Sequence, residues 1–116
     1  MNMRYFLYSI ITVLLLSNSV ALAHPAKEII LKYDNETKLL SVRIAHDSKD
    51  FNKHFIEKVW VSVNKKETVV QGFSSQDDLE KLELQYKIFN LKKGDVISAD
   101  TKCNIFGKKA ASLTIE

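Results

Sequence analysis

The side chains in this sequence that could do chemistry are few: three histidines, His24, His46 and His54, and a single cysteine, Cys103. Imidazole nitrogen and thiolate sulfur are ligands that zinc, iron and copper accept. Seven residues separate His46 from His54. At about 3.3 Å per residue, an extended segment of that length holds the two rings too far apart for one ion. A metal pocket therefore requires that this segment fold back and that Cys103 come close.

Ordinary structural roles remain open for each of these residues. Histidines at the edges of a loop are most often surface or hydrogen-bonding residues, and an isolated Cys103 is most often a small buried hydrophobic residue. His24 is either a frayed terminal residue or, if it becomes the mature N-terminus, a chelator through its free amine and imidazole. That second arrangement suits Cu(II) better than iron.

The first 23 residues have the pattern of a cleavable signal peptide. Arg4 precedes a largely apolar run at residues 6–16, and Ala21-Leu22-Ala23 gives a small-x-small cleavage pattern. The apolar run is shorter than the roughly 20 residues that a membrane-spanning helix needs. We therefore expect a mature domain over residues 24–116 that is periplasmic or secreted and has no stable membrane anchor.

Composition narrows the class of protein further. The net charge is only +3, with both signs spread along the chain, whereas nucleic-acid-binding proteins usually gather Lys and Arg on one face. We expect no nucleic-acid partner, and the sequence leaves the oligomeric state open. One cysteine cannot form a disulfide within the chain, so burial, metal binding or redox chemistry must account for Cys103 in an oxidising compartment.

The elements that must position these side chains are predicted to be short strands, because apolar and polar residues alternate with period two along most of the chain. Seven such segments, with no helical period after residue 23, predict an all-β domain: a seven-stranded antiparallel immunoglobulin-like sandwich. The predicted strands are residues 29–33, 38–45, 55–64, 67–73, 82–88, 96–102 and 109–116.

Alternation also predicts which way the candidate ligands face. His46 continues the apolar row of the second strand, and Cys103 continues the apolar row of the sixth. His54 shares the parity of Trp60, which is opposite to the inward valines of the third strand. Phe51 is the expected apolar anchor of the polar loop between the two histidines.

Two motifs resemble the superoxide reductases (desulfoferrodoxin and neelaredoxin). In that family a His-Pro pair is followed by His-Tyr-Ile-Glu-Trp, and His54-Phe55-Ile56-Glu57 matches the second part of this pattern. Near the C-terminus, Cys103-Asn104-Ile105-Phe106-Gly107 is similar to the family's Cys-Asn-x-His-Gly. The resemblance spans roughly residues 40–109.

This resemblance implies an immunoglobulin-like fold and a non-haem iron centre. In the family, histidines surround a ferrous ion, a cysteine thiolate binds axially, and an outside donor supplies the electron that reduces superoxide. Carried over residue by residue, the ligands are His46, His54 and Cys103, with His24 as a substitute for a histidine that the family has near its N-terminus.

The chain departs from the family pattern at two positions, since Phe106 occupies a histidine position and Asp47 replaces the proline after His46. Three histidines and one cysteine exclude an intact centre of four histidines and one cysteine. The expected function is an exported iron-binding protein whose ligand set is incomplete and is filled by water or Asp47. Oxidoreductase activity on superoxide is the activity that the resemblance implies for such a site. The alternatives are a non-catalytic immunoglobulin-like binding or carrier module and a periplasmic copper-binding protein; zinc is also compatible with the ligands.

Overall fold

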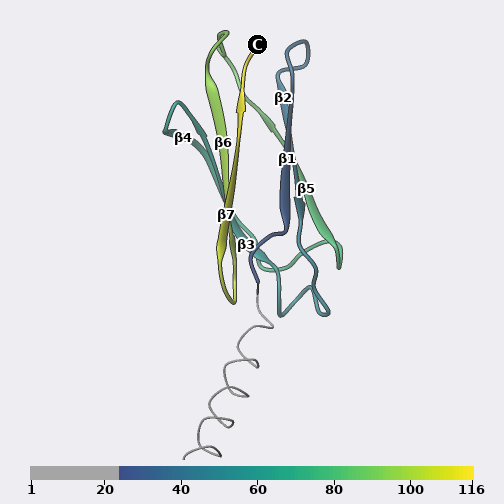
Figure 1. The fold of residues 1–116 in the computed structure, drawn as a ribbon. Coiled ribbons are helices and arrows are strands. Elements are labelled where there is room, and N and C mark those ends of the chain that lie inside the picture. The colour runs from purple at the N-terminus through teal and green to yellow at the C-terminus, as the bar shows by residue number, and fades with distance from the viewer. Residues whose placement is uncertain (1–23) are drawn as a thin grey trace, which may run out of the picture.

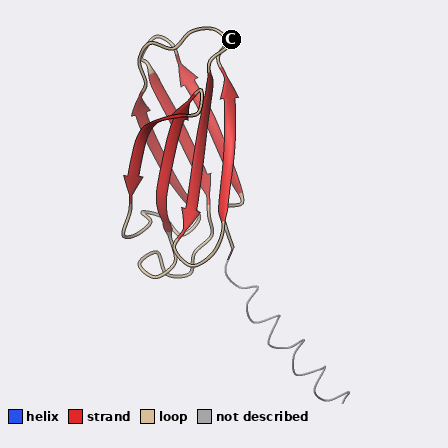
Figure 2. Cartoon of the chain, turned by 90° about the vertical axis from the view of Figure 1, so that its left-hand side faces the viewer, coloured by secondary structure: helices blue, strands red, loops and turns tan. Residues whose placement is uncertain are grey.

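The computed structural model describes residues 24–116, so the predicted signal peptide at residues 1–23 lies outside the described part. Within that part every regular element is a strand (Figure 2), and it holds no helix long and apolar enough to cross a membrane. The all-β prediction is confirmed, with strand ends within one or two residues of those expected. The strands are β1 (Glu28–Asp34), β2 (Leu39–Ala45), β3 (Ile56–Val63), β4 (Lys66–Gly72), β5 (Lys81–Lys87), β6 (Val96–Cys103) and β7 (Lys108–Thr114).

The strands form two antiparallel sheets that pack face to face (Figure 1). One sheet has three strands in the order β1-β2-β5, and the other has four in the order β4-β3-β6-β7. β1 lies against β7, which closes one side of the sandwich. This arrangement is consistent with the immunoglobulin-like prediction, in which strands cross repeatedly from one sheet to the other.

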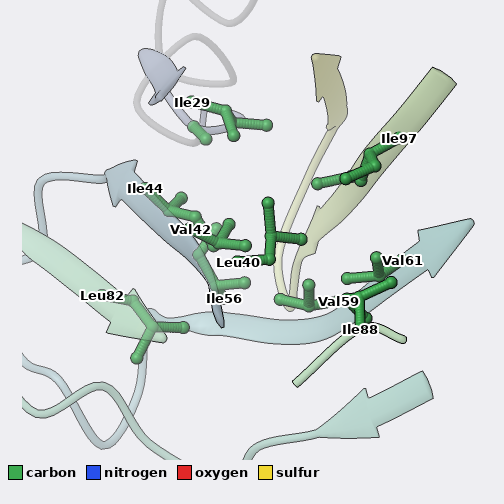
Figure 3. Packing of buried hydrophobic residues seen from close by; sticks show 12 residues of the cluster. Ile29, Leu40, Val42, Ile44, Ile56, Val59, Val61, Leu82, Ile88 and Ile97 are labelled. Atoms are coloured by element: carbon green, nitrogen blue, oxygen red, sulfur yellow. The ribbon is translucent and has the colours of Figure 1, made fainter. Parts of the chain in front are cut away.

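Alternating apolar residues of both sheets meet between the two layers and form one core (Figure 3). In β2, for example, Leu40, Val42 and Ile44 are fully buried while Arg43 is exposed. Each buried aliphatic side chain contributes roughly 1.5–3 kcal/mol relative to an exposed one. The core is made of Ala26, Ile29, Leu40, Val42, Ile44, Ile56, Val59, Val61, Leu82, Ile88, Ile97 and Ala99.

A β-bulge interrupts β3 close to its start. Ile56 pairs with Cys103, and Lys58 pairs with Lys102, which is the residue next to Cys103, so Glu57 is an extra residue without a partner across the β3–β6 pair. A bulge of this kind bends the strand and changes which way the preceding residues face. It lies three residues from His54.

Because of the bulge, His54 faces the opposite side of the sheet from the one that strict alternation predicts. Ile56 and Val59 are both fully buried, although strict alternation would place them on opposite faces. The residues before the bulge therefore face the opposite way from the prediction based on Trp60, which was wrong. His54 lies on the inner side, against the buried Cys103.

Candidate metal centre

All four candidate ligands lie at one end of the sandwich, the lower end in Figure 1. His24 precedes β1, His46 follows β2, His54 precedes β3, and Cys103 is the last residue of β6. Because neighbouring strands are antiparallel, the start of one and the end of the next meet at the same end of a sheet. Residues that lie up to 79 positions apart in the sequence are brought together in this way.

Three of the four form a compact group of possible metal ligands. One donor atom from each of His46, His54 and Cys103 lies within 4.8 Å of the others. His54 Nε2 is 3.2 Å from Cys103 Sγ, and the His46 and His54 rings are 4.6 Å apart at their centroids. His46 and Cys103 are buried, and His54 is half-buried. A metal ion can bind to this cluster.

His24 stands against the same group. Its ring centroid lies 5.4 Å from that of His46 and 5.3 Å from that of His54. Its Nδ1 lies 2.9 Å from the carbonyl oxygen of Pro25. Since a carbonyl only accepts, Nδ1 carries a proton and donates to it.

A glycine makes room for the segment that carries His24. Gly107 has φ of +92°, and a Cβ placed there would come within 2.9 Å of the Pro25 ring. Any other residue would suffer backbone strain and would push Pro25 away. Gly107 therefore fixes where the segment with His24 lies beside the end of β6.

The buried Gln76 determines which nitrogen of His46 is free. Its Nε2 donates to the carbonyl oxygens of His46 and Asp78, both at 2.8 Å. Its Oε1 must then accept, and it lies 2.9 Å from His46 Nδ1 and 3.4 Å from the Ile56 amide nitrogen. His46 Nδ1 consequently donates, and within residues 24–116 the buried His46 Nε2 has no hydrogen-bond partner. An unpaired buried nitrogen is costly, and a metal ion would satisfy it.

Burial keeps two of the histidines neutral. It is the main cause that lowers the pKa of His46. The hydrogen bond that His46 donates to Gln76 acts in the opposite direction, and positive charge on His24 lowers the pKa further. Burial also lowers the pKa of His54, as do the charges of His46 and His24. Neutral imidazole is the form that binds metal, so both side chains favour the ligand form at neutral pH.

Asn104 positions the loop that carries His54. Its Oδ1 accepts from the Phe55 amide and its Nδ2 donates to the Lys53 carbonyl, each at 2.9 Å. These two groups flank His54 on both sides. Because Asn104 follows Cys103 directly, the same short segment sets the distance between the imidazole and the thiol.

The loop between His46 and His54 is anchored by a serine and not by the predicted aromatic residue. Phe51 is exposed, so the prediction that it anchors the loop was wrong. The buried Ser48 instead donates to the His54 carbonyl at 2.6 Å and accepts from the Asp50 amide at 3.2 Å. The loop folds back through polar contacts, which brings the two histidines together.

Two residues considered from the sequence lie outside the cluster. The Asp47 carboxylate pairs with the Lys27 ammonium group, and this contact is the main cause that lowers the pKa of Asp47. Phe106 is 64% exposed at the tip of the loop after β6. Gln76 is the functional residue that sequence reasoning missed, because a glutamine in a polar loop carries no local signal of burial.

Comparison with known proteins does not assign this site to a family. Comparison with protein-family models finds no match, and no curated protein matches the chain either.

Proposed function

We propose that the chain is an exported metalloprotein that binds one iron ion through His46, His54 and Cys103, with His24 as the fourth ligand. The observation that carries this proposal is the partnerless Nε2 of His46, which is buried beside a second imidazole and a thiol. Gln76 holds the opposite nitrogen of that ring, as hydrogen-bonding partners of metal-bound histidines commonly do.

The activity that this ligand set supports best is the one-electron reduction of superoxide. His46, His54 and Cys103 would hold an iron ion, which would supply the one-electron chemistry by which superoxide, with one electron from an outside donor and two protons, becomes hydrogen peroxide. A thiolate ligand raises electron density on the iron and favours this reduction. The resemblance of residues 54–57 and 103–107 to superoxide reductases supports the choice of iron and of this reaction.

Copper is the second candidate, and a specific feature favours it. Two histidines and one cysteine are the ligands of mononuclear copper centres that transfer electrons, and His46, His54 and Cys103 form such a set. Chelation by the His24 amine and Nδ1 has less support, because Nδ1 bonds to the Pro25 carbonyl.

The test is metal binding by the untagged chain 24–116. Fe(II), Cu(II) and Zn(II) are offered separately without oxygen, and bound metal is measured by equilibrium dialysis. We expect one ion per chain and a visible thiolate-to-metal charge-transfer band for Cu(II), and for iron after its oxidation to Fe(III). In Cys103→Ser the band should vanish and the affinity should fall by more than about 100-fold, beyond what loss of a supporting residue costs.

Asp47→Asn is the control, because the Asp47 carboxylate pairs with Lys27 outside the cluster. It should bind metal like the unaltered chain. If none of the three metals binds at one ion per chain, the proposal is refuted and a binding module without metal is favoured. A superoxide assay of the iron-loaded protein, with and without a reductant, then decides catalysis.

A further inference from the structure

The four ligand side chains belong to two pairs, and each pair is attached to a different sheet. His46 extends β2 of the three-stranded sheet, because its amide donates to the Glu80 carbonyl at 2.8 Å. His24 precedes β1 of the same sheet, whose ladder the Lys27 amide extends by donating to the Ala45 carbonyl at 2.7 Å.

The second pair is attached to the four-stranded sheet. Cys103 is the last residue of β6 and pairs with Ile56 of β3. The Asn104 amide then donates to the Phe55 carbonyl at 3.0 Å, which extends this ladder to the residue beside His54. One imidazole pair is thus attached to one sheet and one imidazole–thiol pair to the other. The two sheets lie face to face in Figure 1.

We propose that the bound metal is a structural clasp that joins the two sheets at this end of the sandwich. This inference rests on the proposed metal binding and adds a second role to it. Small exported domains commonly join their sheets with a disulfide, and this chain, with its single cysteine, cannot form one internally. An ion that takes ligands from both sheets makes an equivalent cross-link.

The clasp explains why a buried histidine nitrogen at the site lacks a hydrogen-bond partner when no ion is bound. The aliphatic core between the two sheets is the main source of their cohesion. At the ligand end, the buried His46 Nε2 has no hydrogen-bond partner among the described residues, which costs stability until an ion binds that nitrogen. Because the ion binds the folded arrangement and not the unfolded chain, its binding free energy adds to the stability of the fold.

Amide hydrogen exchange with Zn(II), which has no redox chemistry, tests the clasp independently of activity. We expect zinc to slow exchange on both sheets, at the His46 amide of one and the Cys103 amide of the other. The Lys38 and Gly94 amides lie in turns at the opposite end, where opening is local, so their exchange should not change. At 100 times the dissociation constant, zinc should raise Tm by roughly 10–20 °C.

His46→Gln removes one ligand of the three-stranded sheet and leaves the pair on the other sheet intact. The rise in Tm on zinc addition should fall by more than half in this variant. The matched control is Asn64→Gly at the opposite end, which should lower Tm with and without zinc and leave the rise unchanged.

Two results would overturn the clasp while leaving metal binding in place: slowed exchange at Cys103 without any change at His46, or a full rise of Tm in the double variant His24→Gln/His46→Gln, which lacks both ligands of the three-stranded sheet. Either one would show that the ion is held by one sheet alone. A failure of zinc, iron and copper to bind would instead refute the metal site itself, so the two proposals fail in different ways.

Discussion

At each end of the β3–β6 pair, an asparagine side chain joins the two strands by accepting one hydrogen bond and donating another. At the ligand end, Asn104 follows β6 and holds the segment before β3 through Phe55 and Lys53. At the opposite end, Asn64 follows β3 and holds the segment before β6. Its Oδ1 accepts from the Val96 amide at 2.9 Å, and its Nδ2 donates to the Asp95 carboxylate at 3.0 Å.

The difference lies in what each asparagine holds. The segment held by Asn64 consists of turn residues whose polar groups face water. The segment held by Asn104 carries His54 toward a buried thiol and two further imidazoles. The same hydrogen-bond chemistry thus closes a turn at one end and positions a metal ligand at the other. The following changes should separate stability from metal binding at the two ends.

Gln76→Leu should have the largest effect. It leaves the buried His46 carbonyl, the part-buried Asp78 carbonyl and His46 Nδ1 without their partners. Each unsatisfied buried group costs about 1–3 kcal/mol, so we expect a loss of about 3 kcal/mol or more in unfolding free energy. Metal affinity should fall by roughly 10–100-fold. Urea unfolding and equilibrium dialysis measure the two quantities. The control Gln85→Leu, on the exposed side of β5, should change neither by much; equal effects of the two variants would contradict the role of Gln76.

Gly107→Ala and Gly94→Ala compare a glycine at each end. Both have φ of +92°, so each should lose about 1–2 kcal/mol through backbone strain. Gly107→Ala should lose about 1–3 kcal/mol more, because its Cβ meets the Pro25 ring, while nothing lies within 4 Å at Gly94. Displacement of His24 should also weaken metal binding in Gly107→Ala only. Thermal unfolding and metal titration give both results, and equal stability losses would refute the close contact.

Asn104→Gly and Asn64→Gly test the opening comparison directly. Glycine tolerates the φ of 50° at Asn64, so each change mainly removes two side-chain hydrogen bonds. Both variants should lose about 1–2 kcal/mol of stability. Metal affinity should fall, by roughly 10–100-fold, only in Asn104→Gly. A similar fall in both would mean that Asn104 acts on stability alone.

In the metal-free protein only the ligand end should respond to pH near 6, whereas both ends should respond below pH 3.8, because the pKa of Asp47 at the ligand end is lowered as well. At the ligand end, burial lowers the pKa values of His46 and His54 below the ordinary 6.5. The unfolded state therefore binds more protons there, and stability falls as the pH drops below 6.5. At the opposite end, hydrogen bonds from backbone amides and Asn64 lower the pKa values of Asp34 and Asp95 below the ordinary 3.8, so stability falls again only below that pH.

Urea midpoints measured from pH 8 to pH 3 reveal both losses. His46→Gln should reduce the loss near pH 6 and leave the acidic one, whereas Asp95→Asn should reduce only the loss below pH 3.8. If His46→Gln leaves the loss of stability near pH 6 unchanged, the histidines are not the source of that loss.

The fold and the ligand types were predictable because they depend on local patterns. Period-two alternation gave seven strands, and the positions of His46 and His54 at the two ends of one loop made their convergence possible, whereas Cys103 was placed with them only through the family resemblance. The direction of His54 was not predictable. An extra residue at Glu57 reverses its orientation, and no residue type in that segment announces a bulge.

By itself, then, the sequence determined an all-β domain, the identity of every side chain able to bind a metal, and the impossibility of a four-histidine, one-cysteine centre. Alternation and composition are local or additive properties, which is why they can be read along the chain. The tertiary structure alone decided that His24 lies beside the cluster, that Gln76 fixes the free nitrogen of His46, and that the candidate ligands come in pairs from two sheets. These features arise from contacts between residues 22 to 49 positions apart, and only the packing of the two sheets creates them.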